Sequence, residues 1–161
     1  ILAAVAVPRL TNFGRDARVA KLNAARSAVQ SAMNMAHGAA TARQGEIQPA
    51  CAGGGYGNDP PWINANGNGN LCTQSGRIQV TFMYPTASVA GIVAAAGLVQ
   101  GQGTPSSAEL ASAKVQALGV GGALEIRLLG GSTPEQCAFR YSQPTALGQT
   151  PQVTAVNAAG C

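Results

Sequence analysis

The sequence predicts an α+β fold in which one long amino-terminal helix packs against an antiparallel β-sheet. Within residues 22–40, apolar side chains recur at spacings of three and four, which is the pattern of a helix with one buried face. Residues 77–84, 123–129 and 137–142 instead alternate between apolar and polar side chains, as half-buried strands do. A length of 161 residues suits one domain of this kind.

The predicted helix covers residues 1–43 and opens with a segment, Ile1 to Val7, that is apolar on every side. Such a segment must be buried in protein or lipid. It is far too short to cross a bilayer, which takes roughly twenty residues, so it looks like the end of a longer apolar run. Pro8 then removes a backbone donor, and we expect a bend or a locally melted turn there.

The polarity of this helix changes along its length. Five basic residues lie between Arg9 and Arg26, and the part before Leu22 has no obvious core to face. From Leu22 onward, the apolar stripe can lie on the sheet. Such a helix is apolar on all sides at one end and on one face only at the other. This arrangement is expected if the fully apolar end packs against copies of itself. We therefore divide the chain into a protruding helix, residues 1–21, and a globular head, residues 22–161.

Charged residues make up only 10% of the chain, and small neutral residues dominate, so the surface is expected to be polar without being highly charged. The net charge of +4 comes largely from the basic residues of the helix. A nucleic-acid-binding function is therefore poorly supported. Downstream of Arg43, the residues available for a basic patch are Arg77, Lys114, Arg127 and Arg140.

Four cysteines form two widely separated groups, Cys51 with Cys72 and Cys137 with Cys161. Three pairings are possible. The sequential one is the simplest, because each bridge then closes a loop of about twenty residues and removes roughly 3 kcal/mol of unfolded-chain entropy. A zinc site is the competing interpretation, but no two cysteines stand two to four residues apart and His37 is the only histidine. Disulfides imply an oxidising compartment.

The chain after the helix begins with an irregular segment. Gly45 and Pro49 are expected to end the helix. Residues 50–70 have no period of two or 3.6 and predict a loop that the first cysteine pair closes. Trp62 and Tyr56 are expected to fasten this loop to the body, with an exposed contact for a neighbour or receptor as the alternative.

Regular structure is predicted to resume with a strand at residues 77–84. Thr86 or Ser88 can then cap a short apolar helix. The sequence Ser-Ser-Ala-Glu at 106–109 has the form of a capping box and predicts a second helix that reaches about Leu118.

Residues 123–129 and 137–142 predict an antiparallel hairpin, with Glu125 and Arg127 on its outer face. A last short strand is expected at 152–156. Together these strands predict one sheet whose apolar face covers the helical stripe. The helix-on-sheet core is then expected to contain Leu22, Val29, Met33, Ile78, Val80, Phe82, Leu124 and Ile126.

Nothing in the sequence indicates catalysis, which needs convergent nucleophile, base and stabilising donors or a metal site. The carboxylates are scattered without paired spacing, and His37 is alone on the helix. Asp59 and nearby asparagines offer oxygens to calcium, but one carboxylate in a loop is a weak signal. We expect no enzymatic activity, no cofactor and no metal site.

The first eight residues, Ile-Leu-Ala-Ala-Val-Ala-Val-Pro, followed by Arg9-Leu10 and Asp16-Ala17-Arg18, resemble the end of the amino-terminal helix of type IV pilins. The Asp-Ala-Arg continuation, Tyr-Pro-Thr-Ala-Ser at 84–88 and Gly91-Ile92 are most similar to the MSHA-type (mannose-sensitive haemagglutinin) subgroup. The resemblance of the helix covers about a quarter of the chain. It implies a processing site and roughly fourteen mature residues before Ile1, which would give the apolar run the length of a membrane span.

The resemblance implies a pilin-like roll and a structural subunit that polymerises with copies of itself into a bacterial surface filament for adhesion or motility. It further implies an inner-membrane location before assembly, processing by a prepilin peptidase and contact with a pilus assembly machinery. Pilins commonly close a carboxy-terminal loop with a disulfide, as Cys137 and Cys161 would. The alternatives are a type II secretion pseudopilin, or a minor pilin or adhesin that binds DNA or a surface receptor. Residues expected in the filament core are Ile1, Leu2, Val5, Val7, Pro8, Leu10 and Phe13.

Overall fold

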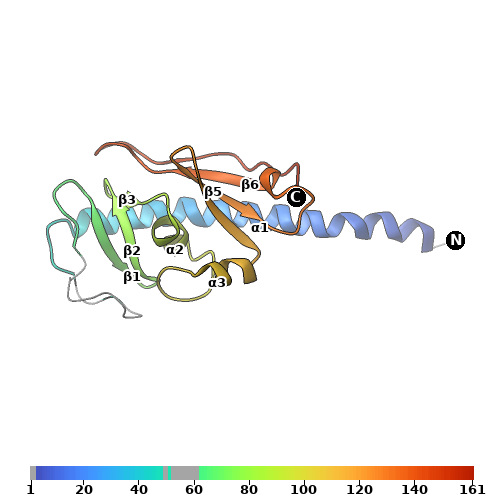
Figure 1. The fold of residues 1–161 in the computed structure, drawn as a ribbon, viewed down its shortest axis with the longest axis horizontal. Coiled ribbons are helices and arrows are strands. Elements are labelled where there is room, and N and C mark those ends of the chain that lie inside the picture. Colours follow the sequence, from blue (N-terminus) through green and yellow to red (C-terminus); the bar gives the residue numbers. More distant parts are fainter. Residues whose placement is uncertain (1–2, 49–50, 52–61) are drawn as a thin grey trace.

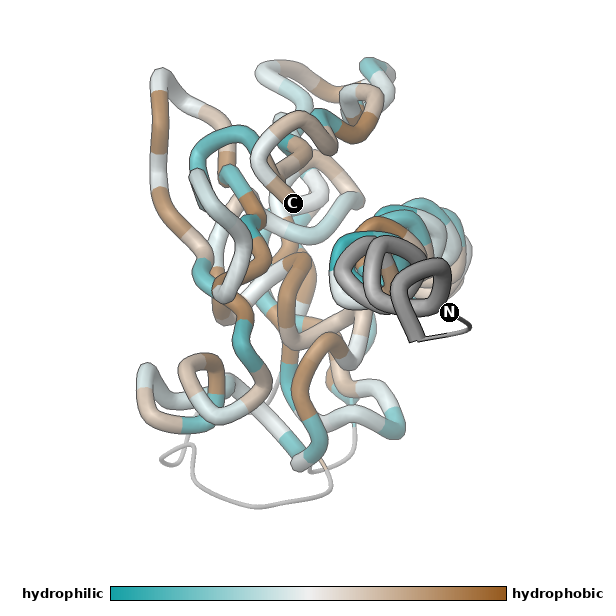
Figure 2. The backbone as a smooth tube through the Cα atoms, turned by 90° about the vertical axis from the view of Figure 1, so that its right-hand side faces the viewer, coloured by the Kyte–Doolittle hydropathy of each residue, from teal (hydrophilic) through white to brown (hydrophobic). Residues whose placement is uncertain are grey.

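A computed structural model describes the backbone of residues 3–48, 51 and 62–161, and the side chains of these residues from Phe13 onward. Helix α1 (Ala3–Ala42) runs the length of the molecule, and its amino-terminal part projects beyond the head (Figure 1). Seen along α1, the head lies on one side of the helix only (Figure 2). The α+β class is confirmed, with a long helix against antiparallel strands.

Helix α1 can be compared with the predicted helix at Pro8 and at its carboxy-terminal end. The helix continues through Pro8 without interruption, so the locally melted turn expected there is absent. Proline removes one backbone hydrogen bond and crowds the carbonyl four residues earlier, but the residues on both sides of it remain helical. At the other end, α1 is followed by a turn in which Gly45 has a φ of +78°, as expected of a glycine beyond a helix terminus.

Within the described residues, the strands form two antiparallel sheets rather than the single sheet predicted. The first, in the order β1-β2-β3, contains β1 (Gly69–Thr73), β2 (Gly76–Thr81) and β3 (Tyr84–Pro85). The second, in the order β4-β5-β6-β7, contains β4 (Val115–Val120), β5 (Ala123–Leu128), β6 (Ala138–Ser142) and β7 (Gln152–Val153). Between the two sheets in the sequence lie the short helical segments η1 (Val89–Val93), α2 (Ala94–Ala96) and α3 (Ser107–Ser112), and η2 (Pro134–Gln136) lies between β5 and β6.

Strand β1 occupies the end of the segment that the sequence predicts to be irregular. Only Leu71 is fully buried in it, so the strand depends on its pairing with β2 rather than on an apolar pattern of its own. The hairpin closes where Thr73 pairs with Gly76.

Strand β4 replaces the second half of a predicted helix. The capping box between Ser106 and Glu109 is present, but α3 ends at Ser112 instead of reaching Leu118. Lys114 has a φ of +57°, which reverses the chain. Its carbonyl accepts a hydrogen bond from Leu129 N at 2.9 Å, and the chain then pairs with β5.

The turn between β2 and β3 corrects a predicted core residue. Phe82 (φ +47°) and Met83 (φ +71°) are both left-handed, a conformation that hairpin turns of two residues usually reserve for asparagine and glycine. Asn68 Oδ1 stabilises the turn by accepting bonds from Phe82 N and the Thr81 hydroxyl, both at 2.9 Å, and Met83 N donates to Gly67 O at 2.9 Å. Phe82 is therefore only partly buried in the turn, and Met83 takes the buried position.

Helix α1 contributes to two core clusters, one for each sheet. Its middle carries Leu22 and Val29, which are fully buried and pack against the four-stranded sheet. Met33 is partly buried against the same cluster. Other members of this cluster are Ile92, Val93, Leu124, Ile126, Leu128, Phe139 and Tyr141. Each such side chain contributes about 1.5–3 kcal/mol when it is fully removed from water.

The second cluster lies beside the carboxy-terminal part of α1 and the three-stranded sheet. Small residues of α1 face this sheet, so the helix approaches it closely. The buried members are Ala36, Ala40, Ile63, Leu71, Ile78, Val80, Met83 and Ala94. One buried hydrogen bond joins the two sheets, from the Tyr141 hydroxyl to Pro85 O at 2.7 Å. Burial, with Tyr84 nearby, raises the pKa of Tyr141, so this hydroxyl stays a donor.

The outer face of the four-stranded sheet holds a buried carboxylate. Glu125 lies on that face as predicted, yet it is only 4% exposed because two arginines cover it. Arg127 Nε lies 2.5 Å from one carboxylate oxygen, and Arg140 Nε lies 2.7 Å from the other. Burial alone would raise the pKa of Glu125, but the hydrogen bonds and charges of Arg140 and Arg127 outweigh it and hold the pKa below its ordinary value of 4.5.

Replacing Glu125 with glutamine is expected to lower the unfolding free energy at pH 7 by about 2 kcal/mol, because the charge-assisted bonds are lost. Since the folded-state pKa is the lower one, the stabilisation is present above about pH 4.5 and disappears as the pH falls through the folded-state pKa. Urea unfolding between pH 3 and 7 should therefore show wild type converging on the Glu125→Gln variant in acid. A constant difference across that range would contradict the assignment.

Candidate assembly surface

The residues that the sequence places in a filament core lie at the projecting end of α1. Most of them fall outside the residues whose side chains the structure describes: Ile1, Leu2, Val5, Val7, Pro8 and Leu10. Phe13 is described, and 74% of its surface is exposed. Among the described residues, neither core cluster includes it. A large aromatic side chain is thus left in water just where the helix leaves the head.

The side of α1 that faces away from the head carries an almost continuous row of small side chains. Phe13 begins this outer stripe, and Met35, which is 75% exposed, lies in its second half. The small residues are exposed and follow one another at spacings of three, four or seven, which keeps them on one face of the helix. They are Ala17, Ala20, Ala24, Ser27, Ser31, Gly38 and Ala42.

The outer stripe has the shape required for close contact with another helix. Small side chains let two backbones approach each other, and the stripe carries no charge that such a contact would have to desolvate. The apolar periodicity of the sequence predicts only the buried stripe. The signal for the outer one was present in the same window, as a second set of small residues on the opposite face.

The basic residues of α1 are directed toward the head instead of standing free in solvent. Arg18 Nε donates to the main-chain oxygen of Cys161 at 2.5 Å, and Arg26 Nε donates to Thr154 O at 2.7 Å. Lys21 Nζ lies 2.6 Å from Ala113 O, and Arg15 Nη2 lies 3.3 Å from Ala158 O. These side chains fasten the helix to the head along its edge and begin at Arg15, within the predicted protruding segment.

The carboxy-terminal segment that receives these bonds is itself anchored by a disulfide. Cys137 and Cys161 are bonded, with an S–S distance of 2.04 Å. Gly160 N donates to Gln136 O at 2.8 Å, and Thr133 N donates to Gly160 O at 3.2 Å. In Figure 1 this end of the chain lies beside α1 where the helix leaves the head. The predicted pairing of these cysteines is confirmed.

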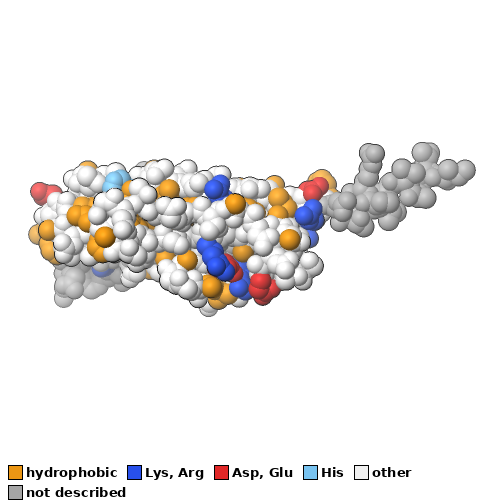
Figure 3. Space-filling view, turned by 90° about the horizontal axis from the view of Figure 1, so that it is seen from above, with side chains coloured by type: hydrophobic (Ala, Val, Ile, Leu, Met, Phe, Trp, Pro, Cys, Tyr) orange, Lys and Arg blue, Asp and Glu red, His pale blue; other side chains and the backbone are white. Residues whose placement is uncertain are grey.

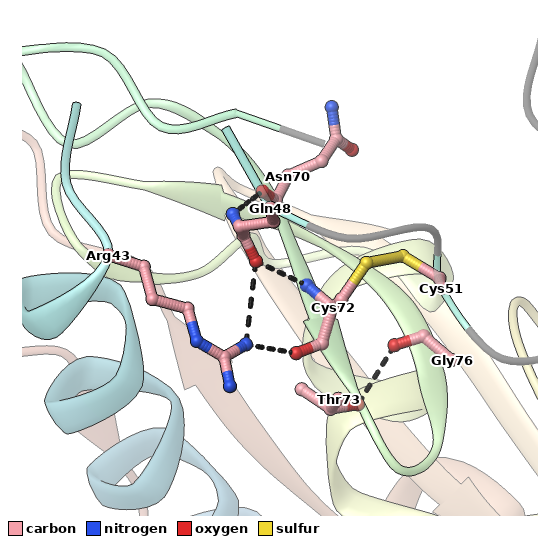
Figure 4. Close-up of a disulfide and its surroundings, with 7 residues drawn as sticks. All are labelled: Arg43, Gln48, Cys51, Asn70, Cys72, Thr73 and Gly76. Atoms are coloured by element: carbon pink, nitrogen blue, oxygen red, sulfur yellow. Dashed lines mark hydrogen bonds between the residues drawn. A yellow bond between two sulfur atoms is a disulfide. The ribbon is translucent and has the colours of Figure 1, made fainter. Parts of the chain in front are cut away.

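The other disulfide, Cys51–Cys72, closes the opposite end of the head (Figure 4). Gln48 is 4% exposed and bridges to β1, where its amide donates to Asn70 O and accepts from Cys72 N, both at 2.9 Å. Arg43 Nη1 donates to Cys72 O at 2.6 Å. The sequential pairing is thus present at both sites, and the end of α1 is tied to the three-stranded sheet.

The other side chains considered in the sequence as possible contacts or ligands are Trp62, Tyr56, Asp59 and His37. Trp62 is 47% exposed, which fits the alternative of an outward contact better than a buried anchor, whereas Tyr56 and Asp59 lie outside the described residues. His37 stacks on Tyr84 with ring centroids 4.3 Å apart, which gives it a packing role in α1.

The surface shown in Figure 3 is mostly uncharged, with a few basic and acidic groups, some of them side by side. Two of the four candidates for a basic patch, Arg127 and Arg140, are paired with Glu125. In the part of the chain that the structure describes, no three His, Cys, Asp or Glu side chains are grouped to hold a metal ion. No described helix combines the length and apolar character of a membrane span.

Comparison with known proteins gives no match to a protein-family model, to a curated protein or to a solved structure. The geometry of α1 and of the outer stripe is therefore the basis on which a function can be argued.

Proposed function

We propose that this chain is the structural subunit of a type IV pilus-like filament that polymerises through α1. The observation that carries the proposal is the asymmetry of this helix. One face is covered by the head, the opposite face is a row of small uncharged side chains, and the basic side chains bind the head. The helix also extends past the head as a rod, and its first five residues, Ala3 to Val7, are all apolar (Figure 1).

The mechanism is the burial of apolar surface between copies of α1. A seven-residue apolar segment such as Ile1 to Val7 offers several kcal/mol per subunit when it is removed from water, at roughly 25 cal/mol per Å². A contact between different surfaces of successive copies produces a helical filament when its rotation and translation do not close into a ring. In this arrangement the projecting part of α1 forms the filament core, and the head, to which α1 is bound from Arg15 onward, forms the outer shell.

The resemblance to pilins supplies the cellular setting of the proposal. The subunit would be held in the inner membrane before assembly, processed by a prepilin peptidase and then added to a filament at the bacterial surface. Two intramolecular disulfides suit an oxidising location of this kind. Adhesion or motility is the corresponding role of the filament.

Replacing Val5 or Val7 with aspartate is expected to abolish filament formation and leave the head folded, because a charge in an apolar helix bundle has no water or partner. The measurement is electron microscopy of material sheared from the cell surface, with an antibody against the head. Leu147→Asp is the matched control, since it introduces the same charge at an exposed apolar residue of the head. Normal filaments from the Val7→Asp strain would refute assembly through this segment.

A further inference from the structure

A pocket lies beside α1 in the half of the helix remote from its projecting end. Its volume is about 340 Å³. A cavity of roughly 150 Å³ lined by apolar side chains is enough to hold a benzene ring. The pocket lies between α1 and the turn that joins β1 to β2, residues 73–75, and its apolar lining includes Ala32, Met35, Ala36, Ala39, Ile78 and Ala95.

We infer that this pocket receives Phe13 from a second copy of the chain. The inference rests on the proposed function and names the contact by which successive subunits are spaced. Phe13 is 74% exposed on its own subunit, and an aromatic ring gains more than most side chains when it is buried. The pocket offers an apolar floor and room for such a ring.

Charge complementarity identifies the occupant as a copy of this chain. Asp16 follows Phe13 by three residues, so it lies on neighbouring helix surface one turn further along. It is exposed, and no described residue forms an ion pair with it. A docked Phe13 therefore brings an uncompensated carboxylate to the pocket.

The pocket carries the matching cation. Arg43 lines it and uses Nη1 to donate to two neutral acceptors, Cys72 O at 2.6 Å and Gln48 Oε1 at 3.5 Å (Figure 4). A guanidinium has five N–H donors, so it retains donors for a carboxylate. No carboxylate among the described residues pairs with Arg43.

The spacing along α1 brings both contacts into register. Arg43 lies four residues beyond Ala39, in the direction in which Asp16 lies three residues beyond Phe13. Two parallel helices offset by about 35–40 Å therefore place the ring in the pocket and the carboxylate near the guanidinium together. Because the pocket and Phe13 occupy different parts of α1, each copy can be both donor and acceptor, and the contact propagates without closing.

The first test is a charge exchange in the full-length chain, measured as the concentration at which filaments sediment. Asp16→Arg and Arg43→Asp are each expected to raise that concentration about tenfold, and the double variant is expected to recover most of the loss. Phe13→Ala is expected to raise it roughly 10–100-fold without changing thermal unfolding, since the ring is exposed within its own subunit. Absence of rescue in the double variant would overturn the inference.

The second test is cross-linking between two populations of the chain, one with Phe13→Cys and one with Ala39→Cys. A disulfide-linked dimer is expected from the mixture and not from either population alone, and Ser112→Cys in place of Ala39→Cys is the control. Filaments that form from the mixed cysteine variants without this cross-link, together with no effect of Phe13→Ala on assembly, would overturn the contact and leave the filament proposal standing. A wild-type chain that stays monomeric at every concentration would overturn both.

Discussion

A chain in which serine replaces both Cys137 and Cys161 is expected to lose about 3.5 kcal/mol of unfolding free energy. The two cysteines are 24 residues apart, and the bridge removes the corresponding freedom from the unfolded chain. The carboxy-terminal segment would also lose its anchor, and with it the positions of Ala158 O and Cys161 O, to which Arg15 and Arg18 donate. Amide hydrogen exchange in α1 between Arg15 and Arg26 is therefore expected to accelerate.

The matched control for this variant replaces Cys51 and Cys72 with serine. Their separation of 21 residues predicts nearly the same loss of stability, because the entropy of loop closure changes slowly with length. Exchange should then accelerate in β1 and β2, with α1 unchanged near Arg18. Urea unfolding and exchange measured on both variants separate the two effects. Identical exchange patterns would show that the carboxy-terminal segment does not hold α1.

Replacing Gly91 with alanine is expected to cost about 3 kcal/mol, because the new methyl group has no room. Gly91 lies in η1, and a Cβ atom there would collide with the hydroxyl, the carbonyl oxygen and the nitrogen of Thr86. Relief of the clash would displace Ile92, which is fully buried and whose N–H bonds to Thr86 O at 3.0 Å. Gly38→Ala is the control. A Cβ atom added at Gly38 meets no atom within 4 Å outside the adjoining helix backbone, and replacing an exposed helical glycine with alanine stabilises the fold by up to about 1 kcal/mol.

Thermal unfolding of the two glycine variants should shift in opposite directions. Equal shifts would mean that η1 moves away from Thr86 at little cost.

The predicted features that the structure reproduces are those with a strong local signal. The periodic stripe of α1, the alternation in β2, β5 and β6, and the capping box before α3 each determine a conformation through neighbouring residues. The predicted features that differ depend on partners distant in sequence. Strand β1 forms because β2 pairs with it. Strand β4 forms because Lys114 adopts a left-handed conformation, which the alanine-rich sequence around it, typical of a helix, does not predict.

Phe82 shows the same limit for a single residue. Alternation from Ile78 predicts an inward side chain, but Asn68, fourteen residues earlier, holds the backbone in a turn. Phe82 therefore lies outside the core because its backbone N–H bonds to a residue distant in the sequence, Asn68. A helix can likewise be recognised from its buried face, whereas the outer stripe becomes a candidate surface only when the head is seen to cover the other side.

The proposed docking site needed the structure for a similar reason. Phe13, Asp16 and Arg43 are ordinary residues of a helix in the sequence. The pocket beside Arg43 forms only where α1 meets the turn between β1 and β2. Sequence reasoning could identify an apolar segment that needs partners, but not the surface that would receive the next one.

Lys21 and Arg26 of α1 donate to peptide oxygens of the head, and the neutral acceptors affect how the molecule behaves at high salt concentration. Mobile ions screen attraction between opposite charges within about 3 Å at 1 M ionic strength. Lys21 and Arg26 instead make short bonds to neutral dipoles, which counterions disrupt far less than they disrupt pairs of exposed charges. The rod and the head are therefore expected to remain joined over a wide range of salinity.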